Sequence, residues 1–484
     1  MDVLLQCAMA CLPVRLATRA GTLTAGILRV VASRLPAKDA GLVAALSPRW
    51  RRAWRSAPLV LDDVHLAVAG VRETVPAVDH LLAAHPGPFR TVRLTFSFFG
   101  SLHHERELAR WPRLLAAKGV QELFFINPPP PMDMPLPADI LRCAELRGLY
   151  LGFWEFPGIR CLPDGAGAFP HLREFVLLNT RIGDRDLDHM LASSPALETL
   201  ALLRLPQHVR LRGQNLQCVL FWLSMADELA VVDTPRLERL LMWLTTTSCG
   251  LDEFDSDDEP PMTIRVRIAS APELKVLGYL DTRVHQLQIG NTIIKVDTEA
   301  SPSFMIPSVK ILALRVDFRV FTEVRMLSSF LRCFPNVETL HVVFSMTDQP
   351  TGKHYGEFLS KLSPIEYLQS HTKKVVLHEF RGDLGEVVFL QHLTQRVKQL
   401  QNLTIVLSKD ILLSVDDMKL VVPRELATPP WASKSCTVLL VGPKHAWNFH
   451  RASDLSTDDP FDSEHGQEFF CFIKEGGQTI WKHM

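Results

Sequence analysis

A short apolar pattern recurs along most of this chain and restricts its fold more than any other feature. Two apolar residues three positions apart are followed by a third, two positions further on. The copies begin at Phe89, Val120, Leu146, Leu172, Leu197, Leu216, Leu237, Leu274, Val309 and Val337. Successive copies start 19 to 37 residues apart. An L-x-x-L-x-L strand every ~20–29 residues is typical of leucine-rich repeats, whose alternating apolar positions share one core.

The segments between these copies favour stacked repeats over a sandwich of short strands. A proline stands two residues ahead of several copies, at positions 170, 195, 235, 272, 307 and 335. Residues 186–191 and 326–331 have helical periodicity, and such a helix must end before the chain turns into the next strand. The order helix, proline, strand therefore predicts an α/β solenoid, an irregular horseshoe with a long exposed concave face.

The stretch ahead of the array predicts two short helices. Leu42, Leu46, Trp50 and Trp54 are spaced four apart, which places them on one side of a helical surface. Pro48 would disrupt a helix interior but suits a first helical position, with Ser47 as its cap. We expect one helix to end near Leu46 and the next to run to Pro58, where residues 59–63 start the first strand. Two tryptophans among arginines on so short a segment cannot bury themselves within it.

These residues resemble the F-box, a helical module that docks onto the adaptor of SCF-type ubiquitin ligases. The resemblance rests on residues 35–36, 38–40, 42, 43, 46, 47 and 49–51, and residues 54–59 resemble the grass members of the family. It implies these adaptor-binding residues: Leu23, Ile27, Leu35, Pro36, Leu42, Val43, Leu46, Trp50 and Trp54. Within that set we expect Trp50 to face the adaptor and Trp54 to face the array. The family's opening Leu-Pro and acidic pair fall here on Leu23-Thr24 and Ala25-Gly26, so the proline and both carboxylates are missing.

The C-terminal part resembles the FBD segment of the same family. Residues 373–382 read as a strand and a turn, 386–400 as a helix, and 400–407 as a closing strand. We expect this unit to cap the array against water. Residues 437–441 predict a further strand. The domains expected are an extension (1–22), an F-box-like module (23–62), irregular repeats (63–350), an FBD-like segment (351–412) and a C-terminal extension (413–484).

Composition and cysteine placement exclude several classes. The 484-residue chain is 47% hydrophobic with a net charge of −1, which indicates a globular protein without a global attraction to nucleic acid or membranes. Its nine scattered cysteines do not form a secreted disulfide framework, and Cys7 and Cys11 read as buried thiols, not as a zinc site. The arginine-rich residues 1–34 have a transit-peptide-like composition, but we favour a first F-box helix over 23–34. The loop at 127–135 is expected to be a spacer and 251–260 a solvated acidic loop.

No motif in the sequence indicates catalysis, a cofactor or a metal, and the adjacent His103 and His104 read as a surface pair. The resemblance implies a non-catalytic substrate receptor, cytoplasmic or nuclear, which binds a Skp-family adaptor, through it cullin, and an unknown target. The first alternative is a repeat scaffold with a degenerate F-box. The second is single-stranded nucleic-acid binding through Arg49, Arg51, Arg52 and Arg55 with the interleaved tryptophans. The wet face of an amphipathic helix explains those arginines better, so we expect neither a nucleic-acid nor a membrane partner.

Overall fold

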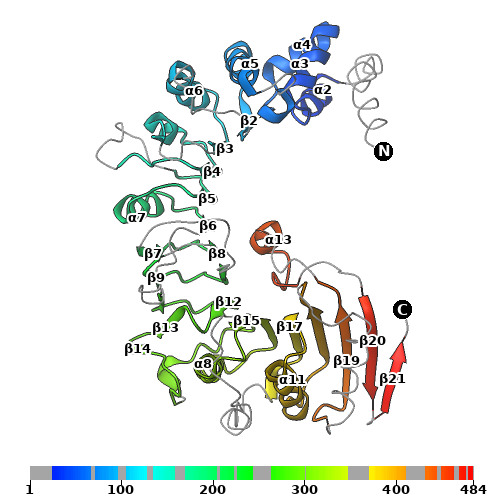
Figure 1. Cartoon of the computed structure of the whole chain (residues 1–484). Helices are drawn as coiled ribbons and strands as arrows, with labels where there is room; N and C mark the ends of the chain where they lie inside the picture. Colours follow the sequence, from blue (N-terminus) through cyan, green and yellow to red (C-terminus); the bar gives the residue numbers. More distant parts are fainter. Residues whose placement is uncertain are drawn as a thin grey trace. The chain divides into compact units, whose positions relative to one another are not determined.

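The structure is a computed structural model of the whole chain (Figure 1), and it forms two compact units, Met1–Pro206 and Gln207–Met484. The residues that it describes are 24–66, 71–95, 105–127, 134–158, 169–203, 208–222, 226–243, 263–299, 301–346, 370–409, 431–443, 449–462, 468–475 and 478–482. Each unit is described by itself.

The first unit begins with the helices α2, α3 and α4, and parallel strands with further helical segments follow them. Its helices and turns are α2 (Ala25–Ala32), α3 (Ala37–Leu46), α4 (Pro48–Ser56), η2 (Asp63–Leu66), α5 (Val71–Ala84), α6 (Glu105–Ala117), η4 (Ala138–Arg142) and α7 (Asp184–Ala192). Its strands are β1 (Leu59–Asp62), β2 (Phe89–Leu94), β3 (Glu122–Ile126), β4 (Gly148–Gly152), β5 (Glu174–Leu178) and β6 (Thr199–Leu203). Neighbours in sequence pair in parallel from β1 to β6, and α6 and α7 lie on one side of them (Figure 1).

The second unit contains a longer sheet of the same kind. Its strands, in spatial order, are β8 (Cys218–Trp222), β10 (Arg239–Trp243), β12 (Val276–Asp281), β15 (Ile311–Val316), β16 (Thr339–Phe344), β17 (Lys374–Phe380), β18 (Asn402–Leu407), β19 (Ser435–Val441), β20 (Glu468–Glu475) and β21 (Gln478–Lys482). Pairing is parallel up to β19 and antiparallel for the last two strands. Helical segments are η6 (Pro302–Phe304), α8 (Phe321–Arg332), α11 (Leu384–Arg396) and α13 (Phe449–Ser453).

A second sheet in this unit was not predicted. It has the order β14 (Thr292–Ile293), β13 (His285–Ile289), β11 (Ile264–Ile268), β9 (Glu228–Asp233) and β7 (His208–Arg212). Only β13 and β14 pair antiparallel. Apolar and polar residues alternate in several of these strands, as in the buried Val209 and Leu211 beside exposed Arg210 and Arg212. One face of each strand therefore supplies a core while the other meets water.

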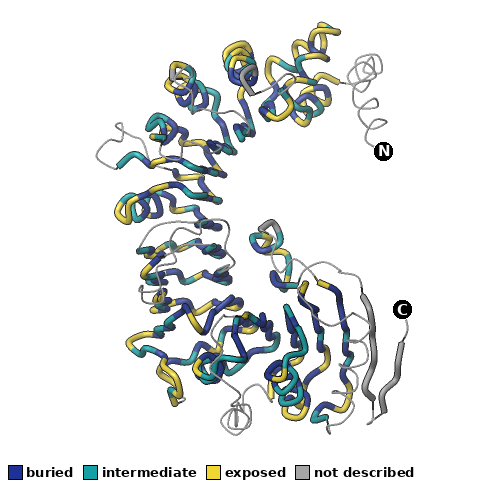
Figure 2. The backbone as a smooth tube through the Cα atoms, viewed as in Figure 1, coloured by how far each residue is buried: buried dark blue, intermediate teal, exposed yellow. Residues whose placement is uncertain are grey.

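Each copy of the apolar pattern contributes to a strand with a buried core. Leu149, Leu151, Leu200 and Leu202 are at most 1% exposed, and buried residues follow the strands of the repeats (Figure 2). One copy is corrected by the structure. A register irregularity in β12 makes Leu280, not Tyr279, the partner of Leu314. The architecture is a repeating α/β arrangement of mostly parallel strands.

The C-terminal strands and helix lie close to their predicted places. The helix is α11, which ends at Arg396 instead of Leu400, and β17 and β18 flank it. A capping box joins Asp383 and Glu386 at the start of α11, which satisfies backbone N–H groups there. The domain boundaries stay a prediction. Cys7, Cys11, Leu23, His103, His104, residues 128–133 and residues 251–260 lie outside the described residues.

Candidate functional site

The candidate site is the three-helix module, defined here as residues 24–62. Thr24 stands at the N-cap of α2, where its hydroxyl accepts a hydrogen bond from the Ile27 N–H at 3.4 Å. This polar cap stands where the family's opening proline would fall. Pro48 is the first residue of α4, as predicted, but the Ser47 side chain makes no capping hydrogen bond. The chain therefore starts each helix with residues suited to that position.

Four large apolar side chains of the module face solvent. On α2, Ile27 is 48% and Val30 is 52% exposed, and on α3, Leu42 is 51% and Leu46 is 57% exposed. Their spacings of three and four place each pair on one face of its helix. Apolar side chains exposed in pairs on short helices, here two helices that both pack on α4, are a feature of surfaces that another protein covers. Val30 was missed in the sequence, although its spacing from Ile27 could have identified it.

The predicted outward orientation of Trp50 is wrong. Its side chain is 2% exposed, and that of Val43 is 0% exposed, so both belong to the core of the module. The reason is that α4 packs against both α2 and α3, and this packing covers the side of α4 that carries Trp50 and Ala53. The indole N–H of Trp50 is buried without a hydrogen-bond partner among the described residues. Burial of the large apolar indole ring thus stabilises the module by more than the one unsatisfied N–H group destabilises it.

Trp54 lies on the side of α4 that meets the array. Its ring makes an edge contact with the His85 ring at 4.8 Å, and His85 makes a similar contact with Phe89 at 5.0 Å. His85 Nε2 lies 3.2 Å from the Ala57 carbonyl oxygen. Burial lowers the pKa of His85, although the hydrogen bond to Ala57 opposes that shift. The imidazole acts as a neutral packing group between α4 and β2.

Leu35 and Pro36 occupy the junction between the module and the first strand. Both are half-buried, and Pro36 forms a parallel bridge with Val60 of β1. Proline suits such a sheet edge because it has no N–H to donate. This bridge fixes the start of α3 beside β1. Of the predicted adaptor-binding residues, the structure therefore places Ile27, Leu42 and Leu46 at the surface and Leu35, Pro36 and Trp54 partly so.

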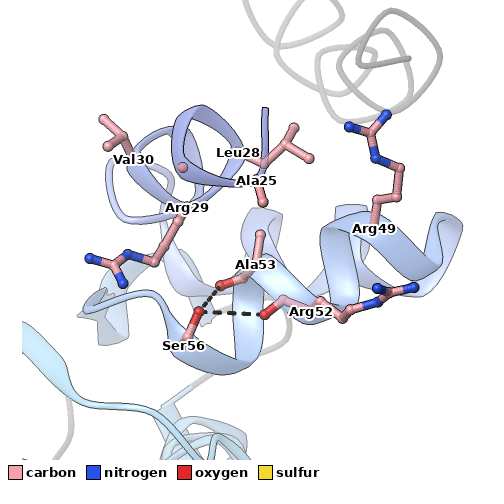
Figure 3. Close-up of a pocket in the computed structure, with 9 residues that line it drawn as sticks. Ala25, Leu28, Arg29, Val30, Arg49, Arg52, Ala53 and Ser56 are labelled. Atoms are coloured by element: carbon pink, nitrogen blue, oxygen red, sulfur yellow. Dashed lines mark hydrogen bonds between the residues drawn. The ribbon is translucent and has the colours of Figure 1, made fainter. Parts of the chain in front are cut away.

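The module carries a strong positive charge. Residues 24–56 contain Arg29, Arg34, Lys38, Arg49, Arg51, Arg52 and Arg55 against a single acid, Asp39. Three of these arginines border a groove of about 570 Å³ between α2 and α4, lined by Ala25, Gly26, Leu28, Arg29, Val30, Arg49, Arg52, Ala53 and Ser56. Figure 3 shows the guanidinium groups extending outward from it, while the Ser56 hydroxyl donates to the Arg52 and Ala53 carbonyl oxygens. The surface thus combines exposed apolar groups with a basic border.

The described residues offer no site for a metal. Within the described ranges, no group of three or more His, Cys, Asp or Glu side chains is arranged to hold an ion. No helix among the described residues is both long and apolar enough to cross a membrane.

Comparisons with known proteins agree with the repeats. Residues 108–342 match a family described as FBD-associated F-box protein At5g56370, LRR repeats. The chain is 22% identical to F-box/FBD/LRR-repeat protein At1g13570 of Arabidopsis thaliana over 86% of this chain and 96% of that protein. The chain is a relative of the plant F-box/FBD/leucine-rich-repeat proteins. A second Arabidopsis relative, F-box/FBD/LRR-repeat protein At5g56420, is 25% identical over 43% of this chain and 51% of its own length.

The family match can be compared with the elements of the structure. The matched residues 108–342 run from α6 to β16 and contain the strands of eight of the ten apolar copies completely, together with most of the last. The three-helix module precedes this region, and β17, α11 and β18 follow it. The match therefore covers the repeats, while the three-helix module and the β17–α11–β18 unit lie outside it.

Proposed function

We propose that this chain is the substrate-receptor subunit of an SCF-type ubiquitin ligase, without catalytic chemistry of its own. The module would bind a Skp-family adaptor and through it cullin, while the repeats would bind the target in the cytoplasm or nucleus. Ubiquitin transfer then depends on proximity, because the receptor raises the local concentration of the target near the conjugating enzyme. The observation that carries this proposal is the exposure of Ile27, Leu42 and Leu46 on a basic module ahead of the repeats.

The exposed side chains define the expected chemistry of the adaptor surface. A leucine that is half-exposed gains roughly 1 kcal/mol when the rest of its surface is covered. An aspartate in its place adds the cost of burying an unpaired charge. Seven basic side chains against one acid also favour an adaptor with an acidic border. We therefore expect adaptor binding to be apolar at its centre and to weaken as salt concentration rises.

Capture of a purified Skp-family adaptor by the full chain tests this proposal. Leu42→Asp and Leu46→Asp should each weaken adaptor binding at least ten-fold. Val64→Asp is the matched control, because Val64 is 52% exposed but lies in η2, outside α2 and α3. If the native chain does not capture the adaptor, the receptor function is refuted. If all three variants capture it as well as the native chain does, docking through Leu42 and Leu46 is refuted.

A repeat scaffold with a degenerate F-box is the second candidate. It is favoured by the absence of the family's proline and two carboxylates at Thr24, Ala25 and Gly26. Adaptor capture and the lifetime of the bound partner distinguish the two candidates. A scaffold would bind a partner through the repeats without capturing the adaptor and without changing that partner's lifetime in cells.

A further inference from the structure

A C-terminal segment of the second unit lies on the strands of the main sheet. We call residues 451–462 the strap, and it includes the end of α13 (Figure 1). The side chains that contact it belong to four strands, and together with His378, which contacts His341, they are defined as the receiving face: Arg239, Tyr279, His341, Lys374 and His378. In β10, β16 and β17 these residues alternate with core leucines and valines, so they project from the opposite side of the sheet.

Arg239 holds the backbone of the strap. It is 4% exposed, and its guanidinium donates to the carbonyl oxygens of Ala452 at 3.3 Å, Asp454 at 2.9 Å and Leu455 at 3.5 Å. It also donates to the Thr457 carbonyl oxygen. A guanidinium presents several N–H donors in a fixed plane, which suits a turn of peptide carbonyls. This contact recognises main chain and not a particular side chain.

Two aspartates of the strap meet the basic groups of the receiving face. Asp459 accepts from His341 Nε2 at 3.0 Å and from Lys374 Nζ at 3.3 Å, and Asp462 accepts from Lys374 Nζ at 2.8 Å. His341 is completely buried, and its Nδ1 lies 3.1 Å from His378 Nε2. Burial would raise the pKa of Asp459, but His341 and Lys374 together hold it well below its usual range. Charge-assisted bonds of this kind select a carboxylate.

An aromatic anchor stands between the two aspartates. Phe461 is 1% exposed, and its ring makes an edge contact with Tyr279 at 4.8 Å and a tilted contact with His341 at 5.4 Å. The Tyr279 hydroxyl is buried without a hydrogen-bond partner among the described residues. The sequence Asp459-Pro460-Phe461-Asp462 is thus recognised at three of its four positions.

These contacts have the composition of a peptide-binding site. Peptide recognition combines main-chain hydrogen bonds for affinity with side-chain pockets for specificity, and aromatic and charged anchors contribute most of the energy. A segment needed only to cover apolar surface would not require a buried arginine, a buried histidine and a partly buried lysine beneath it, because burying charges costs free energy unless each one is paired. The strap therefore behaves as a ligand that the chain supplies to itself.

We propose that the receiving face is a recognition site for acidic-aromatic protein segments of the form Asp-x-Phe-Asp. The strap occupies this site as an internal ligand, and a partner segment of the same chemistry displaces it. The inference rests on the proposed function in that the repeats receive the target. Tethering gives the strap an effective concentration in the millimolar range, so a free segment of equal intrinsic affinity binds the native chain weakly.

A peptide of residues 451–462, labelled with a fluorophore, tests the site by fluorescence polarisation. The full chain carrying Asp459→Ala and Phe461→Ala should release its strap and bind this peptide at least ten-fold more tightly than the native chain does. A control peptide with the same two substitutions should not bind. Adding Lys374→Ala to the released chain should weaken peptide binding at least ten-fold. A folded, released chain that does not distinguish the two peptides overturns the proposal.

Hydrogen exchange of the native chain gives a second test that needs no folded variant. If the strap is displaceable, its amides should exchange through local opening at least ten-fold faster than those of β10 and β16. Equal exchange in the strap and these strands would mean that the segment is an integral part of the sheet, and the proposal fails. Adaptor capture by the same preparations separates the two ideas. If the native chain does not capture the adaptor although the released chain binds the peptide, only the receptor function is refuted.

Discussion

Replacing Trp50 by alanine tests whether its indole stabilises the module or contacts a partner. The side chain is 2% exposed, and truncating a buried tryptophan costs about 3–5 kcal/mol. One term opposes this cost. The indole N–H is buried without an acceptor among the described residues, which already destabilises the folded state by roughly 1–3 kcal/mol. We therefore expect a net loss near the lower end, about 3 kcal/mol.

Trp50→Phe separates the two terms. It keeps most of the ring and removes the unsatisfied N–H, so we expect a change of less than about 1.5 kcal/mol. A chain with two compact units is unsuited to a single global unfolding free energy. Hydrogen exchange of α2, α3 and α4 measures the local stability instead. A loss of 3 kcal/mol should speed their exchange roughly 100-fold in Trp50→Ala.

Leu46→Asp is the matched comparison on the same module. Leu46 is 57% exposed, so its replacement should leave exchange in the three helices nearly unchanged while it weakens adaptor binding. The opposite pattern for Trp50→Ala, unchanged exchange with loss of adaptor capture, would refute our assignment of Trp50 to the core.

Three further predictions concern the second unit. Burial lowers the pKa of His285 to about 4, and its Nδ1 accepts a hydrogen bond from the Asp281 N–H at 2.8 Å. Between pH 6.5 and 4 the unfolded chain therefore binds more protons than the folded chain, and local stability at β13 should fall by up to about 3 kcal/mol on acidification. Hydrogen exchange corrected for intrinsic rates measures this loss, and His285→Asn should reduce it. Burial raises the pKa of Glu386 to about 7, so the folded chain binds more protons than the unfolded chain between pH 4.5 and 7. Stability at α11 should therefore fall as pH rises over this range, and Glu386→Gln should remove the dependence in the same exchange measurement. Gly278 has φ +147°, and a Cβ there would lie 2.8 Å from Ala313 Cα and closer still to its carbonyl oxygen. Gly278→Ala should therefore speed hydrogen exchange in β12, whereas Gly41→Ala, where the added atom has no neighbour within 4 Å, should not speed exchange in α3.

Helix limits in the module were predictable because local chemistry sets them. Pro48 can begin a helix but cannot continue one, and α4 begins at that residue. The orientation of Trp50 was not predictable in this way. Periodicity identifies a common side for Leu42, Leu46, Trp50 and Trp54 only if one helix carries all four. The break at Ser47 rotates α4 relative to α3, so Leu46 stays exposed while Trp50 is buried.

The strap shows the same limit over longer distances. His341 and Asp459 are 118 residues apart, and Arg239 lies more than 200 residues before its partners. Nothing local to Asp459-Pro460-Phe461-Asp462 marks it as a partner of β16 and β17. Only the stacking of repeats brings His341, Lys374 and His378 to one face.

The elements that back the main strands could have been predicted more fully from the sequence. The copies at Leu197, Leu216 and Leu237 are 19 and 21 residues apart, which leaves little room for a helix and two turns. The chain places β7 and β9 there instead. A short strand leaves its N–H and C=O groups unpaired unless a neighbour pairs with it, so strand-backed repeats occur together and form a second sheet. This sheet also includes β11 and β13, which lie in repeats 37 and 35 residues long. Longer spacings earlier in the chain accommodate α6 and α7. Period-two alternation, which β7, β11 and β13 show, thus indicates strand-backed repeats more reliably than spacing does.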